Sequence, residues 1–157
     1  MSHTDAAATT WWPIAADSSG RSARQAVVAL QRVDDGGAAG GVLRVGDDPV
    51  AVQVARDNAR INGERPFIRA ATADGLVHPA IRGRAPFDLI VANILAGPLT
   101  YLAPSLAAAL APGGVAVLSG LLRNQEQLVL SFYRSQGLVF RKALRDGPWS
   151  ALVLERP

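Results

Sequence analysis

The chain has 157 residues, of which 49% are hydrophobic and 18% are charged, a balance typical of one compact domain that folds unaided. Zero cysteines exclude a disulfide framework and a thiolate metal site, and we predict no metal because the histidines, His3 and His78, lie far apart in sequence. The net charge of +3 comes almost wholly from arginines that are scattered along the chain, so we expect no nucleic acid as a direct ligand.

The first 41 residues carry a weaker pattern than the rest of the chain. Residues 1–20 are small, polar and interrupted, and only residues 11–16 could form a short strand. The segment "SARQAVVALQRV" has an N-capping serine and helical spacing of apolar residues, which predicts a helix over residues 22–33. The run "DDGGAAGG" then ends it. We therefore predict an atypical N-terminal segment over residues 1–41 and a regular domain over residues 42–157.

The regular domain begins with a strand, a helix and a second strand. "VLRVG" predicts a strand at Val42–Gly46, and "PVAVQVARDNARING" predicts a helix that starts at Pro49 and closes on Asn62-Gly63. We expect this helix to bury four apolar side chains, namely Val50, Val54, Ala55 and Ile61. "PFIRAATADG" then predicts a strand that ends at Asp74-Gly75.

The second half continues the alternation of strands and helices. "APFDLIVANIL" predicts a strand whose unbroken apolar residues 89–92 are buried on both faces. "PLTYLAPSLAAALAPGG" predicts a helix closed by Gly113-Gly114, "GGVAVLSG" a buried strand, and "NQEQLVLSFYRSQG" an amphipathic helix. The tail predicts two strands joined in a hairpin at Asp146-Gly147.

This order of elements predicts an α/β fold, a Rossmann-like doubly wound sheet with helices on both faces. The closing hairpin adds a final antiparallel strand to a parallel sheet. That feature distinguishes methyltransferase-type sheets from most dinucleotide-binding ones.

Polar side chains follow three of the predicted strands. Asp47 and Asp48 come after the first, Asp74 after the second and Asn93 after the third. Ligands of doubly wound sheets bind at these carboxyl ends, where one carboxylate can accept ribose hydroxyls and another the amine of adenine. The alternative interpretation is that the aspartates are helix caps and turn residues.

Asn93 interrupts an apolar run, which raises the question of what its carboxamide does there. At the rim of the sheet, beside the chain bending at Gly97-Pro98, its oxygen can accept hydrogen bonds from a substrate amine. Such a site would catalyse mainly by alignment. The alternative is a buried asparagine satisfied by the neighbouring backbone.

Residues 88–122, with the following "NQEQLVLSFYRSQGL" and the tail "DGPWSALVLERP", resemble the catalytic domain of the bacterial methyltransferases that modify large-subunit ribosomal protein eleven. The segment "DDPVAVQVARDNARING" resembles the same family. No apolar run reaches the roughly 18 residues needed to span a bilayer, so we expect a soluble cytoplasmic protein away from membranes. The resemblance implies S-adenosylmethionine as cofactor and a ribosomal protein as amine acceptor. It implies catalytic roles for Asn93 and Ile94 and a cofactor site that includes Asn93 and the following residues: Gly46, Asp47, Asp48, Asp74 and Gly75.

Two departures from the family pattern predict an impaired cofactor site. Gly46 stands where the family usually has the ribose-binding acid, and the family's glycine-rich turn has no counterpart beyond "ADSSGRS" at residues 16–22. A non-catalytic, degenerate protein of the same fold is therefore the alternative hypothesis. A nucleic-acid amine methyltransferase ranks lower, because it predicts Asn-Pro-Pro-aromatic at the Asn93 motif.

Overall fold

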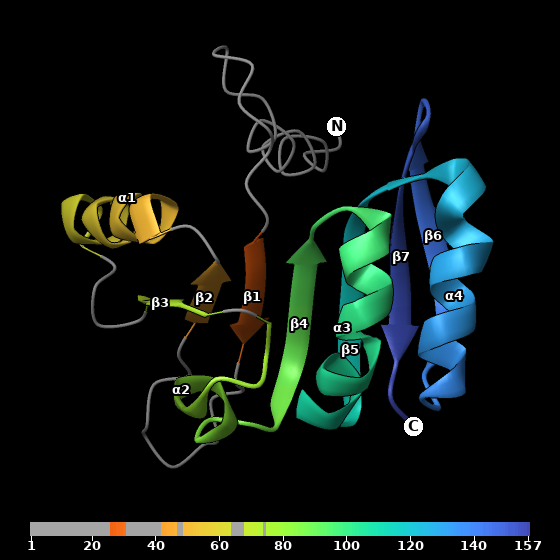
Figure 1. The fold of residues 1–157 in the computed structure, drawn as a ribbon, viewed down its shortest axis with the longest axis horizontal. Coiled ribbons are helices and arrows are strands. Elements are labelled where there is room, and N and C mark those ends of the chain that lie inside the picture. The colour runs from red at the N-terminus through yellow and green to blue at the C-terminus, as the bar shows by residue number, and fades with distance from the viewer. Residues whose placement is uncertain (1–25, 31–41, 47–48, 64–67, 74) are drawn as a thin grey trace, which may run out of the picture.

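The computed structural model describes residues 26–30, 42–46, 49–63, 68–73 and 75–157 (Figure 1). The elements in chain order are β1 (Ala26–Leu30), β2 (Val42–Gly46), α1 (Pro49–Ile61), β3 (Ile68–Thr72), α2 (Pro79–Arg82), β4 (Phe87–Asn93), α3 (Ala96–Ala109), β5 (Leu110–Leu122), η2 (Arg123–Gln125), α4 (Glu126–Ser135), β6 (Val139–Asp146) and β7 (Trp149–Glu155). The strands form one sheet in the order β3-β2-β1-β4-β5-β7-β6. The predicted Rossmann-like α/β sheet with a C-terminal antiparallel hairpin is thus confirmed.

Strand β1 corrects the prediction of a helix over residues 22–33. Residues Ala26–Leu30 lie between β2 and β4 and pair antiparallel with both. A short apolar run with two adjacent valines fits a strand as well as a helix, and pairing on both sides decides between them. The possible strand at residues 11–16 lies outside the described residues.

Helix α1 forms where the sequence predicts it, but it buries a different face. Val52 and Ala55 are buried, together with Ala59 one turn further along. Of the residues expected to point inward, Ala55 does so, whereas Val50, Val54 and Ile61 are 62%, 51% and 74% exposed. The prediction followed the apolar spacing alone, and the helix instead turns its small residues toward β2 and β3, which it contacts.

The start and end of α3 differ in how well the sequence predicted them. Gly97 and Pro98 lie in its first turn, where a proline fits because the first N–H groups of a helix have no partner within it. The predicted close at Gly113-Gly114 is wrong, because the helix ends at Ala109 and Leu110 already pairs with Phe87 of β4. The two glycines lie inside β5, where the pairing with β4 shifts register.

The core lies between α3, α4 and one face of the sheet. The two helices lie side by side in front of the C-terminal strands (Figure 1). On the sheet face beneath them the following side chains are fully buried: Ile90, Ala92, Ala116, Leu118, Leu152 and Leu154. The alternate residues of β4, Leu89 and Val91, are only half-buried. Complete burial on both faces of β4 is therefore not seen among the described residues.

The C-terminal hairpin forms as predicted. Strands β6 and β7 pair antiparallel from Val139↔Glu155 to Asp146↔Trp149, with the turn at Gly147. Strand β7 pairs antiparallel with β5, so the hairpin extends the parallel β4–β5 pair. No helix in the described part of the chain is both long and apolar enough to cross a membrane.

Candidate active site at the carboxyl edge of the sheet

Gly46 ends β2 and Asn93 ends β4. These two strands run in the same direction and lie on either side of β1. Val27 of β1 pairs with Val45, and Ala26 pairs with Asn93, so both strand ends lie level with Ala26. Two strand spacings separate them, which is about 10 Å. The structure therefore brings two of the predicted site residues to one edge.

The acidic residues predicted for this edge are only partly located. Asp47, Asp48 and Asp74 lie outside the described residues. Gly46 is half-buried and its carbonyl accepts the N–H of Ala73 at 3.0 Å, which fixes the end of β2 against the chain leaving β3. Gly75 has φ +70°, a conformation that favours glycine, and its turn lies against the Leu102 side chain of α3.

Asn93 is the last residue of β4 and is half-buried. It pairs with Ser119 of β5 on the side away from β1, and the next N–H, that of Ile94, donates to the Ser119 carbonyl at 3.2 Å. The backbone is thus held on both sides up to the point where the chain leaves the sheet. The predicted bend at Gly97-Pro98 is wrong. The chain turns at Ile94 and Leu95, and Gly97 and Pro98 already belong to α3.

Gly120 packs against the Asn93 side chain, and the sequence analysis did not single it out. A Cβ atom at Gly120 would lie 2.6 Å from the Ile94 carbonyl oxygen and 3.1 Å from Asn93 Oδ1. Gly120 also has φ +85°, which side chains rarely adopt. Because glycine has no side chain, Gly120 leaves room for the Asn93 carboxamide and the Ile94 carbonyl group. A glycine after an apolar strand was the available signal, but it is equally typical of an ordinary turn.

A carboxylate–guanidinium pair braces the neighbouring end of β5. Arg145 of the hairpin donates from Nε and Nη2 to the two Glu126 carboxylate oxygens, both at 2.7 Å. Glu126 begins α4 and is buried. The Arg145 guanidinium lowers the pKa of the Glu126 carboxyl to about 2, against the opposing effect of burial. Residues this far apart in sequence gave no signal of the pair.

The direction of β1 limits what this edge can bind. In a doubly wound sheet the first strand runs parallel to its neighbours, and the turn after it carries cofactor-binding glycines. Here the last residue of β1, Leu30, pairs with Val42 and Leu89, near the starts of β2 and β4. The chain therefore leaves β1 at the edge opposite Asn93. No turn following β1 can begin beside Asn93.

The described residues contain no group of three histidine, cysteine, aspartate or glutamate side chains placed to hold a metal ion. The chemistry available at the edge is that of hydrogen-bond acceptors. Asn93 Oδ1 and the Ile94 carbonyl oxygen can both accept N–H groups from a ligand.

Comparisons with known proteins show the family to which the chain is similar. The family model described as ribosomal protein L11 methyltransferase (PrmA) matches residues 37–157. Curated ribosomal protein L11 methyltransferases from Brucella suis and Chelativorans sp. are 50% and 46% identical over 114 and 115 residues. Each match covers 73% of this chain but only 40% of the relative, so the chain spans about two fifths of these relatives' length.

Solved structures show the same fold. A ribosomal protein L11 methylase from Lactobacillus delbrueckii subsp. bulgaricus superposes with a TM-score of 0.66 at 28% identity, over 73% of this chain and 56% of that one. A TehB-like SAM-dependent methyltransferase from Corynebacterium glutamicum gives 0.54 at 18% identity, over 73% and 66% of the two chains. The second likeness concerns the fold alone.

Proposed function

The chain belongs to the ribosomal protein L11 methyltransferase (PrmA) family, and from this membership we propose that it transfers a methyl group from S-adenosylmethionine to an amino group of a ribosomal protein. The reaction belongs to residues 42–157 in this proposal, and residues 1–41 form an atypical segment. The protein acts in the cytoplasm. The observation that carries the proposal is the position of Asn93 at the end of β4, where it pairs with Ser119 of β5 and lies beside Gly120.

Asn93 and Ile94 position the acceptor amine in this proposal. The Asn93 carboxamide oxygen and the Ile94 carbonyl oxygen each accept one N–H, which leaves the nitrogen lone pair directed away from both. An amine must be neutral to attack the methyl group. The two carbonyl oxygens do not take up its proton, but they fix the direction of its N–H groups. The contribution of these two groups is therefore alignment of the reacting nitrogen.

The fit of the cofactor divides into two parts. Gly46, Asp47 and Asp48 at the end of β2 would face the ribose, and Asp74 with Gly75 would face the adenine, since carboxylates accept hydroxyl and amine hydrogens. When bound, S-adenosylmethionine supplies an electrophilic methyl group. The antiparallel β1 does not fit its methionine portion, because β1 ends at Leu30, at the edge of the sheet opposite Asn93. We therefore expect the chain to bind the cofactor weakly.

A transfer assay with radiolabelled S-adenosylmethionine and purified ribosomal protein L11 tests the proposal. The Asn93→Ala variant should lose transfer while its free energy of unfolding stays within about 1–2 kcal/mol of the wild type, the cost of one hydrogen bond at a half-buried site. Retained transfer in this variant would remove Asn93 from the site. A large loss of stability would instead support the role of a structural core asparagine.

A second candidate, a non-catalytic protein of this fold, is favoured by one observation. Strand β1 lies between β2 and β4 and runs antiparallel to both, so the described sheet takes up this position with a strand that ends away from the proposed cofactor site. Absence of transfer to any ribosomal protein, together with absence of cofactor binding, would support this candidate.

A further inference from the structure

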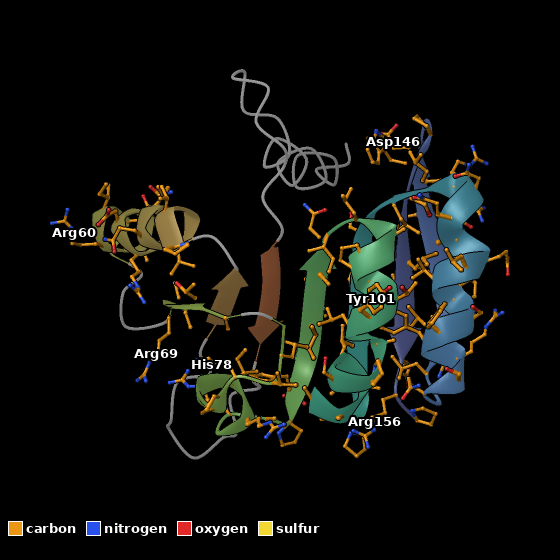
Figure 2. All side chains as sticks on the ribbon, viewed as in Figure 1. Arg60, Arg69, His78, Tyr101, Asp146 and Arg156 are labelled. Carbon is orange, nitrogen blue, oxygen red and sulfur yellow. The ribbon has the colours of Figure 1, made fainter. Side chains whose placement is uncertain are left out.

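Three arginines that are separate in the sequence line one groove at the outer edge of the sheet. The groove has a volume of about 470 Å³ and lies between α1 and the edge strand β3. Its polar lining comes from Gln53, Arg56, Asp57, Arg60 and Arg69. Figure 2 shows Arg60 and Arg69 on the same flank of the molecule, one on the helix and one on the strand. We call this feature the arginine groove.

One of the three arginines builds the groove. Arg56 donates from Nε at 3.2 Å and from Nη2 at 2.9 Å to the carbonyl oxygen of Ala70, and so ties α1 to β3. Because β3 is an edge strand, this bond also covers part of its open side. Arg56 is therefore held in place, with Nη1 still available as a donor.

The other two arginines are exposed and pair with no residue in the part of the chain that the structure describes. These are Arg60 of α1 and Arg69 of β3. Among the described lining residues Asp57 is the one acidic side chain, and it accepts a hydrogen bond from Gln53 Nε2 at 3.2 Å. The described lining thus sets three guanidinium groups against one carboxylate, an excess of two positive charges.

We propose that the arginine groove binds the phosphodiester backbone of a nucleic acid strand. This departs from the expectation drawn from the sequence, because the fold gathers arginines that are scattered along the chain. Guanidinium groups present planar pairs of donors that match phosphate oxygens, and an open groove suits a continuous strand better than a small enclosed ligand. The described lining residues include no aromatic ring on which a base could stack, so the contacts that they offer are to phosphates and are independent of sequence. Two strands, β2 and β1, separate the groove at β3 from Asn93 of β4, and the role of the groove does not depend on methyl transfer.

Fluorescence anisotropy with short labelled single strands of RNA and of DNA tests this inference on the full chain. The variant is the double substitution Arg60→Gln and Arg69→Gln, which leaves the structural Arg56 in place. The matched control is Arg134→Gln with Arg141→Gln, which removes the same charge from α4 and β6, at the opposite end of the sheet. Circular dichroism and thermal melting confirm that both variants fold.

The groove variant should bind both strands at least tenfold more weakly than the wild type, while the control changes affinity less than twofold. The slope of log affinity against log salt should fall by about 1.4, because each phosphate contact contributes about 0.7 for single strands. Equal losses in both variants, or no wild-type binding at micromolar protein, would overturn the inference. Competition by inorganic phosphate at low millimolar concentration would also overturn it, because the groove would then take a free anion.

Discussion

Two regions of one sheet are covered by helices that bury very different side chains: residues 87–157, under α3 and α4, and strands β2 and β3, under α1. The C-terminal region carries α3 and α4 across one sheet face and holds large side chains that are fully buried, among them Tyr133 and Leu118. In the N-terminal region α1 covers its strands with Val52 and small alanines and leaves Val50, Val54 and Ile61 exposed. The proposed acceptor site is on the well-packed region and the proposed ribose and adenine contacts are on the other. The proposed acceptor site therefore adjoins large buried side chains, whereas the strands proposed to hold the cofactor are covered by a helix that buries mainly small ones.

The largest expected difference between the two regions is the loss of stability when a side chain is truncated to alanine. Leu118→Ala removes a fully buried side chain and should lower the free energy of unfolding by about 2–5 kcal/mol. Val54→Ala removes a side chain that is 51% exposed and should change it by less than about 0.5 kcal/mol. Urea denaturation of both variants measures the difference. Similar losses would show that α1 is packed against something as firmly as the core is.

A pair of glycines with the same backbone angle sharpens the account of the acceptor side. Gly120 and Gly137 both have φ +85°, but a Cβ would meet the Ile94 carbonyl at the first and open space at the second. Each change to alanine should cost about 1–3 kcal/mol for the strained backbone, with a further loss at Gly120 from the contact. Only Gly120→Ala should reduce methyl transfer, by at least tenfold. Equal transfer by the two variants would remove Gly120 from the site.

The brace at the end of β5 predicts a smaller effect that depends on pH. The folded-state pKa of Glu126 is about 2, below its ordinary value of 4.5, so its contribution to stability is present above pH 4.5 and is lost as the pH falls toward 2. Glu126→Gln should flatten the pH dependence of the melting temperature in that window. An unchanged acid profile in the variant would mean that Arg145 does not stabilise the ionised carboxylate.

Local patterns predicted most elements of the C-terminal region. The apolar run at β4, the spacing in α4 and the turn at Gly147 each depend on residues close in sequence, and each predicted element formed, whereas α3 ends at Ala109 and not at Gly113-Gly114. The segment at Ala26–Leu30 needed information that its own residues lack, because the partners on either side decided its conformation. The face of α1 was missed for the same reason, since exposed valines satisfy helical spacing as well as buried ones.

The candidate site was predictable in part. Asn93 was identified because a carboxamide in an apolar strand is unusual, and the structure places it at the carboxyl edge level with Gly46. Gly120 was not, because its importance comes from a contact between adjacent strands: a Cβ atom at Gly120 would lie 3.1 Å from Asn93 Oδ1. The roles of Asp47, Asp48 and Asp74 stay predictions, because these residues lie outside the described part of the chain.

Calorimetric titration with S-adenosylmethionine, on the wild type and on Gly46→Asp, tests most directly whether the ends of β2 and β4 form one methyl-transfer site. The account predicts weak but measurable binding by the wild type and tighter binding by the variant, because an acid at position 46 restores the ribose acceptor. Absence of heat at millimolar ligand in both proteins would contradict the enzymatic account, and equal affinities would contradict the placement of Gly46 at the ribose.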